Sequence, residues 1–425
     1  MQSKQQHITV FEHETLRIDR GNKRLTDAQL DALQLYYGEN GVPYYSLIHK
    51  GVKFCEYVGV LQIGNTTIEI LPKADKNNET SIWREVLIGM LHAVGIFNLK
   101  APSSANLQIK TNSILDLYFE LFIIELEYLI RRGLVKKYRK TEGNSNALKG
   151  SIQFAQHLNK NLVHQERFYV RYTTYDKEHE LHAILYKALK LLNQINSNAQ
   201  LSSRLGSLLL DFPEMPDIKI TDSLFDKITL NRKTEPYKNA IEIARLLLLN
   251  YHPDLSKGQN DILALLFDMN VLWEQFVYAS LRKFKSKETT ITAQNMKNFW
   301  KPQKGNRSRM KPDIVLNKDK SNCIVLDTKW KNLNGYNPSP EDLRQLYVYL
   351  KYYNAQKVAL VYPSELSKIK SGTYYLESDG NIGTEECSII SIPVNKQIRN
   401  WQKEISEQIK KWETKPNSHK LDYMV

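Results

Sequence analysis

The chain has 425 residues, 42% of them hydrophobic and 25% charged, so it is long enough for two or three domains with their own cores. No apolar run approaches the roughly 18 residues of a membrane span, and the N-terminus, MQSKQQHITVFEHE, lacks the apolar stretch of a secretory signal. The three cysteines, Cys55, Cys323 and Cys387, show neither zinc-ligand spacing nor a disulfide pattern, which favours a reducing, cytoplasmic compartment.

The net charge of +13 and the pI near 9.3 favour a polyanionic partner, because each neutralised phosphate releases a condensed counterion. A lysine-rich proteome gives the same sum, so the distribution of charge is more informative. Residues 281–331 contain fourteen Lys and Arg against four acids, a local charge of +10. The segment RRGLVKKYRK (131–140) has six basic residues and no acid, and is interpreted as a contact for DNA or a partner, or as a solvated helix end.

Three segments differ in their patterns. Residues 1–100 contain short strand-like runs, KFCEYVGVLQIG and TTIEILPK, around a turn at Gly64-Asn65, followed by an amphipathic helix at 83–95 that ends at Gly95. Residues 101–255 are mainly helical, with helices expected at 113–133, 176–195 and 235–250, a partly extended stretch around LKGSIQFAQHL and RFYVRYTTYD, and a linker at 252–258.

Residues 256–425 begin with a helix expected at 261–284. Strands are expected in KPDIVLN, NCIVLDTKW and KVALVYP, with a helix at 340–354 between the last two, and the tail from about 412 is polar. This order predicts a mixed α/β core. The chain is therefore predicted to be an α+β multidomain protein, with an N-terminal β-rich region (1–100), a helical middle region (101–255) and a C-terminal α/β domain (256–425).

Two acids flank the first two strands of the third segment. Asp313 opens DIVL and Asp327 ends CIVLD, so an antiparallel hairpin would bring both carboxylates to one end of the sheet, where they could share Mg²⁺. Lys329 lies two residues beyond Asp327 and points to the same side of the strand. A cation there can help a metal-bound water ionise, or stabilise charge on a phosphate. Acids and lysines at strand ends are also common as solvated turn residues.

Three further polar residues are candidates for the same site. Glu274 lies among apolar neighbours on the helix that opens the third segment, and could hold a second metal or a metal-bound water. Gln345 and Tyr349 are four apart and share one helix face, where an amide and a phenol could orient a phosphate or a catalytic lysine. A surface glutamate and a tyrosine-rich core helix are the structural alternatives.

The set KPDIVL, IVLDTKWK, an upstream helical glutamate and a downstream Gln-x-x-x-Tyr resembles the PD-(D/E)XK nuclease superfamily. More narrowly, VGVLQIGNTTIEILPK, ELFIIELEYLIRRGLVKKY, ALKGSIQF and LFDMNVLWEQFV make the chain similar to the McrC family, the nuclease subunit of the McrBC 5-methylcytosine-specific restriction systems. The resemblance covers most of residues 10–365.

The resemblance implies a PD-(D/E)XK-like nuclease domain at 256–425. Asp313 would match the first metal-binding acid, and Asp327 and Lys329 the acid and lysine of the D-x-K element. Glu274 resembles the helical glutamate, and Gln345 with Tyr349 an accessory motif of some branches. With these roles, Asp313, Asp327 and the backbone carbonyl of Thr328 would hold Mg²⁺, with Mn²⁺ as the alternative ion, and Glu274 would support the metal or its water.

The family also implies a partner, an McrB-like hexameric AAA+ motor that hydrolyses GTP and recognises methylated or otherwise modified DNA. The N-terminal and middle regions would engage this motor and stimulate it. The chain has no G-x-x-x-x-G-K-[ST] phosphate loop, so GTP hydrolysis is expected on the partner. The predicted function is Mg²⁺-dependent DNA cleavage without sequence readout of its own. The alternatives are an inactive adaptor that stimulates the motor, and a nuclease directed at RNA.

Overall fold

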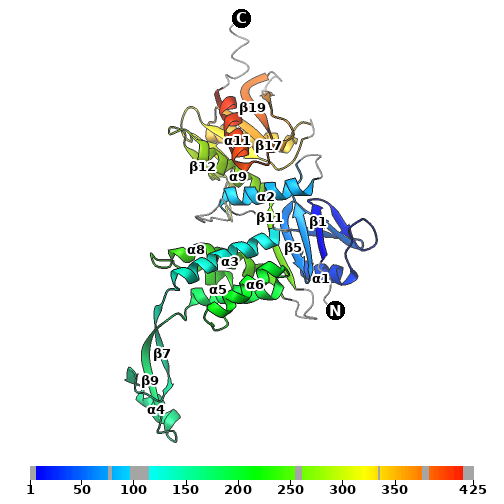
Figure 1. Ribbon diagram of the computed structural model, residues 1–425. Coiled ribbons are helices and arrows are strands. Elements are labelled where there is room, and N and C mark those ends of the chain that lie inside the picture. Colours follow the sequence, from blue (N-terminus) through cyan, green and yellow to red (C-terminus); the bar gives the residue numbers. More distant parts are fainter. Residues whose placement is uncertain are drawn as a thin grey trace. The chain divides into compact units, whose positions relative to one another are not determined.

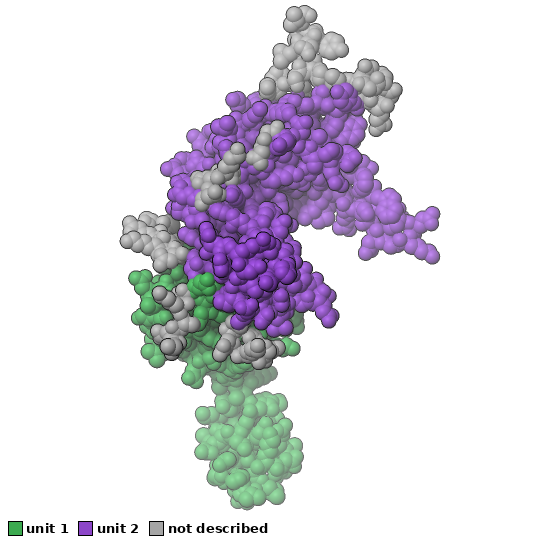
Figure 2. Space-filling view, turned by 90° about the vertical axis from the view of Figure 1, so that its right-hand side faces the viewer, with its two compact units in different colours: residues 1–6, 62–66, 101–265 green, residues 7–61, 67–100, 266–425 purple. Residues whose placement is uncertain are grey.

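The computed structural model describes residues 6–74, 79–95, 114–253, 261–333, 336–375 and 382–414. The chain divides into two compact units, each discontinuous in sequence (Figure 2). Unit 1 contains Met1–Gln6, Gln62–Thr66 and Ala101–Leu265, and unit 2 contains His7–Leu61, Thr67–Lys100 and Leu266–Val425. Most of the expected linker and the tail beyond 414 lie outside the described residues. The division into segments at about 100 and 255 stays a prediction.

The N-terminal segment is rich in strands. Its elements are β1 (Gln6–Phe11), β2 (Thr15–Arg17), α1 (Asp27–Tyr37), β3 (Tyr45–Ile48), β4 (Gly51–Phe54), β5 (Tyr57–Ile63) and β6 (Thr66–Leu71). Strands β2, β4 and β3 form one sheet, and β1, β6 and β5 are neighbours in a second sheet that also contains β11 and β10. Gly64 adopts a φ of 51° between β5 and β6, so the predicted turn is confirmed. Helix α1, which the sequence patterns did not predict, begins with a capping box of Thr26 and Gln29.

Helix α2 (Thr80–Val94) confirms the amphipathic helix of the first segment. It ends as predicted at Gly95, whose φ of 85° places it in the left-handed region that favours glycine. Trp83, Val86 and Met90 are spaced at helical intervals and are buried, which defines the apolar face of the helix.

Unit 1 is built around four packed helices, α3 (Ile114–Arg132), α5 (Glu180–Ile195), α6 (Ala199–Asp211) and α8 (Lys238–Leu249). Shorter turns, α7 (Asp222–Asp226) and η1 (Glu235–Tyr237), precede α8. Helix α3 is buried on several faces and ends before Gly133, as its sequence predicts. The helix expected at 176–195 is wrong at its start: Asp176 ends a strand, where its carboxylate accepts a hydrogen bond from Glu178 N and pairs with Arg139.

A long two-stranded ribbon projects from these helices (Figure 1). Strand β7 (Lys137–Ser145) pairs antiparallel with β9 (Phe168–Asp176) along its whole length, and β8 (Ser151–Ile152) and α4 (Phe154–Asn161) connect them. The extended stretch expected here is confirmed for β8 and β9, while the residues from Phe154 are helical.

The helix expected at 261–284 is wrong in its first third. Residues Ile262–Asp268 form strand β11, which pairs with β10 (Tyr251–His252), and helix α9 begins only at Met269 and ends at Phe284. The apolar run ILALLF fits a buried strand as well as a helix. Asp268 decides the boundary, because its carboxylate caps α9 by accepting hydrogen bonds from Asn270 N at 2.8 Å and Val271 N at 3.3 Å.

The rest of unit 2 contains a six-stranded mixed sheet in the order β12-β15-β16-β17-β19-β18. Its elements are β12 (Ile291–Ala293), β15 (Ile314–Leu316), β16 (Ile324–Thr328), α10 (Pro340–Tyr353), β17 (Lys357–Ser364), β18 (Lys368–Tyr375), β19 (Ile382–Pro393) and α11 (Ile398–Thr414). A separate two-stranded ribbon is formed by β13 (Lys297–Trp300) and β14 (Ser308–Met310). The predicted strands, the helix at 340–354 and the mixed α/β character are confirmed.

Helix α10 connects the parallel strands β16 and β17 and covers one face of the sheet. Its Leu346 and Tyr349 pack in one core with Val325 and Val358. Asp327 lies two residues after Val325, so it belongs to the face that α10 covers. Across the described residues, no helix is long and apolar enough to cross a membrane.

Candidate active site

The two predicted carboxylates meet at one end of the β15–β16 hairpin. The antiparallel register pairs Ile314 with Leu326, which places Asp313 opposite Asp327. Thr328, the next residue on β16, holds Asp313 in place: its backbone N and its Oγ1 both donate to Asp313 Oδ2, at 2.6 and 2.8 Å. The sequence-based placement of the acid pair is therefore confirmed, and Thr328 takes part through two donors.

Lys329 faces the same pair. Its Nζ lies 2.9 Å from Asp327 Oδ2 and 4.0 Å from Asp342 Oδ1. Burial alone would lower the pKa of Lys329, but the carboxylates of Asp327 and Asp342 raise it above its ordinary value. Lys329 therefore stays positively charged at neutral pH and suits the stabilisation of negative charge better than proton abstraction.

Asp327 is the more buried acid of the pair, with 2% of its surface exposed. Burial, followed by the nearby charge of Asp313, raises the pKa of Asp327 to about 7, and Lys329 opposes this rise. Burial also raises the pKa of Asp313, against the two Thr328 hydrogen bonds. Two neighbouring carboxylates that are shielded from water repel each other when both are ionised, unless a positive charge lies between them.

Glu274 lies beside the acid pair, on α9. Burial raises the pKa of Glu274, and the charge of Asp313 raises it further. Gln294, which sequence reasoning missed, connects the two acids: its Nε2 donates to Glu274 Oε1 at 2.9 Å, and its backbone N donates to the carbonyl of Asp313 at 2.9 Å. Gln294 has a φ of 51°, an uncommon conformation for a residue with a side chain, and such positions concentrate at functional sites.

Gln345 and Tyr349 share one face of α10, as predicted. Gln345 Nε2 donates to Tyr349 Oη at 2.7 Å, and Tyr349 Oη donates to the carbonyl of Lys311 at 3.2 Å. Burial raises the pKa of Tyr349, and the charges of Asp327 and Asp313 add to this. The phenol therefore lies within electrostatic range of the acid pair and fixes the backbone just before Asp313.

Asp342, at the start of α10, is a second residue that sequence reasoning missed. Burial would raise the pKa of Asp342, but Lys331 at 2.9 Å, Ser339 and Lys329 together lower it. Asp342 thus stays ionised and holds both lysines at the edge of the site. No periodic pattern marks it, because acids are common in the first turn of any helix.

Trp330 fixes the backbone immediately after Lys329. Its backbone N donates to Asn270 Oδ1 at 3.2 Å, and its indole Nε1 donates to Glu12 Oε1 at 2.8 Å. The ring packs edge-on against Trp83 and Trp273, with centroids 6.5 and 5.5 Å away. Burial raises the pKa of Glu12 to about 7, against hydrogen bonds from Lys73 N and Trp330.

The donor set suits a hard divalent cation. Asp327 Oδ2 is buried, and its neighbour is the Lys329 ammonium at 2.9 Å, outside ideal hydrogen-bond geometry. Within the part of the chain that the structure describes, no three His, Cys, Asp or Glu side chains gather around one point. Mg²⁺ is commonly bound by one or two carboxylates, and its remaining coordination positions are filled by water and phosphate oxygens.

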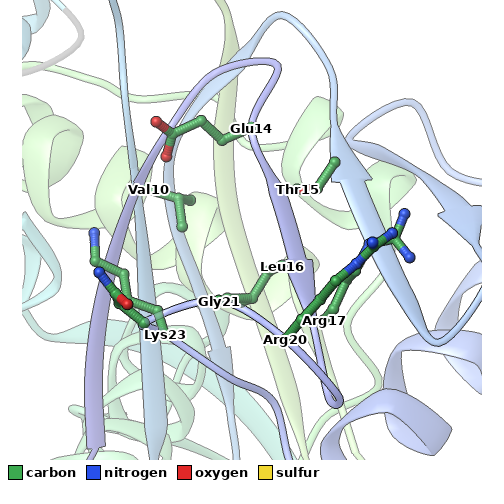
Figure 3. A pocket seen from close by; sticks show the side chains of 9 residues that line it. Val10, Glu14, Thr15, Leu16, Arg17, Arg20, Gly21 and Lys23 are labelled. Atoms are coloured by element: carbon green, nitrogen blue, oxygen red, sulfur yellow. The ribbon is translucent and has the colours of Figure 1, made fainter.

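Two cavities of unit 2 contain basic side chains. One of about 460 Å³ lies on β1, β2 and the following loop, and its lining includes Arg17, Arg20 and Lys23 (Figure 3). Its acid, Glu14, accepts a hydrogen bond from Phe11 N, so it contains no acid pair. The other, about 900 Å³, begins at Trp330 and is lined by four lysines, Lys73, Lys331, Lys368 and Lys370. Its lining includes Trp330 and Lys331, the two residues that follow Lys329 in the chain.

Fold and site together define a multidomain α+β protein with an acid pair and a lysine at one end of two neighbouring strands of a mixed sheet. The family model described as McrBC 5-methylcytosine restriction system component matches residues 52–363, a range that includes Asp313, Asp327 and Lys329. The chain belongs to this family, which confirms the resemblance to the McrC family found in the sequence.

One solved structure shares the fold of this chain. A chain of the half-complex from the tetradecameric assembly of Thermococcus gammatolerans McrB AAA+ hexamers with bound McrC is 21% identical, with a TM-score of 0.71 over 96% of this chain and 100% of that chain. A chain of the cryo-EM structure of the Thermococcus gammatolerans McrBC complex is 22% identical, with a TM-score of 0.49 over 65% and 87%. No curated protein matches the sequence.

Proposed function

We propose that this chain is the DNA-cleaving subunit of a modification-dependent restriction system, with a PD-(D/E)XK-type centre that requires Mg²⁺, or Mn²⁺ in its place. The observation that carries the proposal is the pair of the half-buried Asp313 and the buried Asp327, with Lys329 Nζ 2.9 Å from Asp327. Membership of the McrBC family supports the biological setting. The basic window at 281–331 and the four-lysine cavity support a polyanionic substrate.

In the proposed reaction, a water oxygen bonds to phosphorus while the bond to the leaving oxygen breaks, and that oxygen departs with a proton. Asp313 and Asp327, with the backbone carbonyl of Thr328, would hold the metal ion. When bound, the ion lowers the pKa of water and stabilises charge on the phosphate.

The chain's other residues act by position and charge. The Thr328 hydrogen bonds orient Asp313, Glu274 accepts a proton or supports a water, and the Lys329 ammonium stabilises the extra negative charge of the transition state. The hydrogen bonds from Gln345 to Tyr349 and from Tyr349 to the Lys311 carbonyl fix the backbone two residues before Asp313.

The test is cleavage of methylated and unmethylated plasmid by this chain with an McrB-like AAA+ motor from the same genome, GTP and Mg²⁺. Wild type is compared with Asp327→Ala and, as a control, with Asp319→Asn, which changes an exposed acid in the turn between β15 and β16 to a residue that tolerates its φ of 61°. Cutting that is lost only in Asp327→Ala, with GTP hydrolysis still stimulated, supports the proposal. Equal stimulation with intact DNA for every variant would establish the adaptor alternative instead. Selective cutting of a matched RNA would establish the other alternative.

We further propose that the β7–β9 ribbon contacts an McrB-like AAA+ hexamer. Five large apolar side chains at its far end are 61–86% exposed: Leu148, Phe154, Leu158, Leu162 and Val163. Contiguous exposed apolar groups of this kind mark protein interfaces. The fold is shared with a chain from a complex of McrB hexamers with bound McrC, which supports such a partner.

This contact is tested by GTP hydrolysis of the motor. Replacing Phe154 and Leu158 with serine is expected to reduce stimulation at least tenfold, because apolar anchors carry most of an interface's free energy. Leu210→Ser is the matched control, since Leu210 is 88% exposed on α6 of the same unit. Full stimulation by the double variant would place the motor contact elsewhere.

A further inference from the structure

The two-stranded ribbon β13–β14 is strongly basic. From Lys297 to Lys311, both included, the sequence contains six Lys and Arg and no acidic residue. Residues 298–309 are exposed, apart from the half-buried Pro302, and Gly305 with a φ of 107° allows the turn between the strands. A projecting hairpin with this charge attracts an anion along its length.

The same ribbon exposes large apolar side chains. Met296, Phe299 and Trp300 are 53%, 49% and 58% exposed. The pairing register shifts between Asn298 and Trp300, so Phe299 is the extra residue of a bulge, a feature that re-aims side chains at sheet edges. The chain has six tryptophans, and all except Trp300 are at most 7% exposed. An exposed tryptophan on a ribbon rich in Lys and Arg indicates a ligand with both phosphates and flat rings.

The base of the ribbon is anchored next to the acid pair. Lys297 Nζ donates to the Tyr352 carbonyl at 2.8 Å and lies 4.4 Å from the centre of the Tyr353 ring, and Tyr353 Oη donates to the Asn295 carbonyl. At the other strand, Met310 is buried in the sheet core. Lys311, which follows, is two residues before Asp313. The far end of the ribbon is therefore free for contact while its base is tied to the active-site strand.

We propose that the β13–β14 ribbon binds the DNA strand next to the cleaved phosphate, with its Lys and Arg on the backbone and Trp300 stacked on an unpaired base. This inference rests on the proposed nuclease function and names how its substrate is held. Six cations without an acid disfavour a protein partner, because the buried centres of protein interfaces are depleted in charge. Stacking requires an accessible ring face, so single-stranded or gapped DNA is expected to bind more tightly than continuous duplex.

The test uses tryptophan fluorescence of the full chain in EDTA, so that binding is measured without cleavage. A single-stranded DNA 30-mer, its duplex and an RNA of the same sequence are titrated in turn. Single-stranded DNA is expected to quench the emission, and Trp300→Leu to abolish the quench and weaken binding roughly 5- to 100-fold, the range of one base-stacking contact. Trp300→Tyr should retain most of the affinity. Tyr375→Leu, at another exposed aromatic of unit 2, should match wild type.

The cationic part of the inference is tested by salt. Arg307→Ala should weaken binding to all sequences alike and reduce the slope of log affinity against log salt by about 0.7 for single strands. Lys403→Ala, an exposed lysine on α11, is the matched control and should leave the slope unchanged.

The outcomes separate this inference from the nuclease proposal. The ribbon assignment is overturned if DNA leaves the tryptophan emission of the chain unchanged. It is also overturned if wild type and a folded Trp300→Leu variant bind DNA with equal affinity, even if the complex with the motor cuts DNA. Stronger quenching by RNA overturns the choice of DNA. Quenching by DNA in a protein that never cuts with its motor supports the ribbon and removes the nuclease proposal.

Discussion

Replacing Asp327 with asparagine is expected to stabilise the metal-free protein at alkaline pH. The side chain is 2% exposed and lies opposite Asp313, so its charge has a large desolvation cost that Lys329 offsets only in part. Asparagine keeps the shape and removes the charge. An acidic residue whose replacement raises stability is one that the fold keeps for another purpose.

The magnitude follows from the pKa of Asp327, which is raised from 3.8 to about 7. Between these values the folded state binds more protons than the unfolded state, so stability falls as the pH rises through this window and is constant above it. Relative to a neutral side chain, Asp327 then lowers the free energy of unfolding by about 4 kcal/mol at pH 8, where it is ionised in the folded protein, and by about 2 kcal/mol at pH 5, where only the unfolded chain is ionised. For a unit of this size this corresponds to roughly 10 °C in melting temperature at pH 8 and about half of that at pH 5.

The assay is thermal unfolding from pH 5 to pH 8 in a chelator, with Asp319→Asn as the control because Asp319 is 75% exposed. Added Mg²⁺ should then raise the melting temperature of wild type and leave that of Asp327→Asn nearly unchanged. If Asp327→Asn unfolds below wild type at pH 8 in chelator, or if the gap between them does not narrow toward pH 5, the electrostatic reasoning is refuted.

Three further predictions concern positions around the site and the root of the long ribbon. Lys329→Met should reduce cleavage by about 10²- to 10³-fold, the effect of losing one preorganised charge, with DNA affinity nearly unchanged in a binding assay. Gln294→Asn tolerates the left-handed backbone but is too short to reach Glu274, so the cleavage rate should fall about tenfold, with an unchanged melting temperature. Tyr237→Phe removes the acceptor for Val135 N at the root of β7 and should lower stability by about 1–3 kcal/mol in urea unfolding.

The acid pair could be predicted because the hairpin itself aligns it. A short connection between two apolar strands gives one dominant register, and that register places Asp313 opposite Asp327. Strand alternation then places Lys329 on the same side. Helical spacing predicted the contact between Gln345 and Tyr349 equally well.

Other parts of the site carry no local signal. Gln294 reaches Glu274 and Asp313 only through tertiary structure, and its sequence context is an ordinary loop. Strand β11 was mistaken for helix because a short run of buried apolar residues has no period of its own. The full β7–β9 pairing was missed in part because both of its faces are largely solvated, which removes the alternation that identifies a strand.

Trp330 has a consequence for how this protein can be divided or fused. The residue after the proposed catalytic lysine rests on Glu12, 318 positions earlier in the chain, and on Trp83 of the first segment. A fragment that begins at residue 256 would therefore expose this indole and release the backbone beside Lys329, even though it contains every proposed catalytic side chain. The proposed active site therefore does not form an independent domain. Fusing it to another DNA-binding protein would require the N-terminal strands to be included.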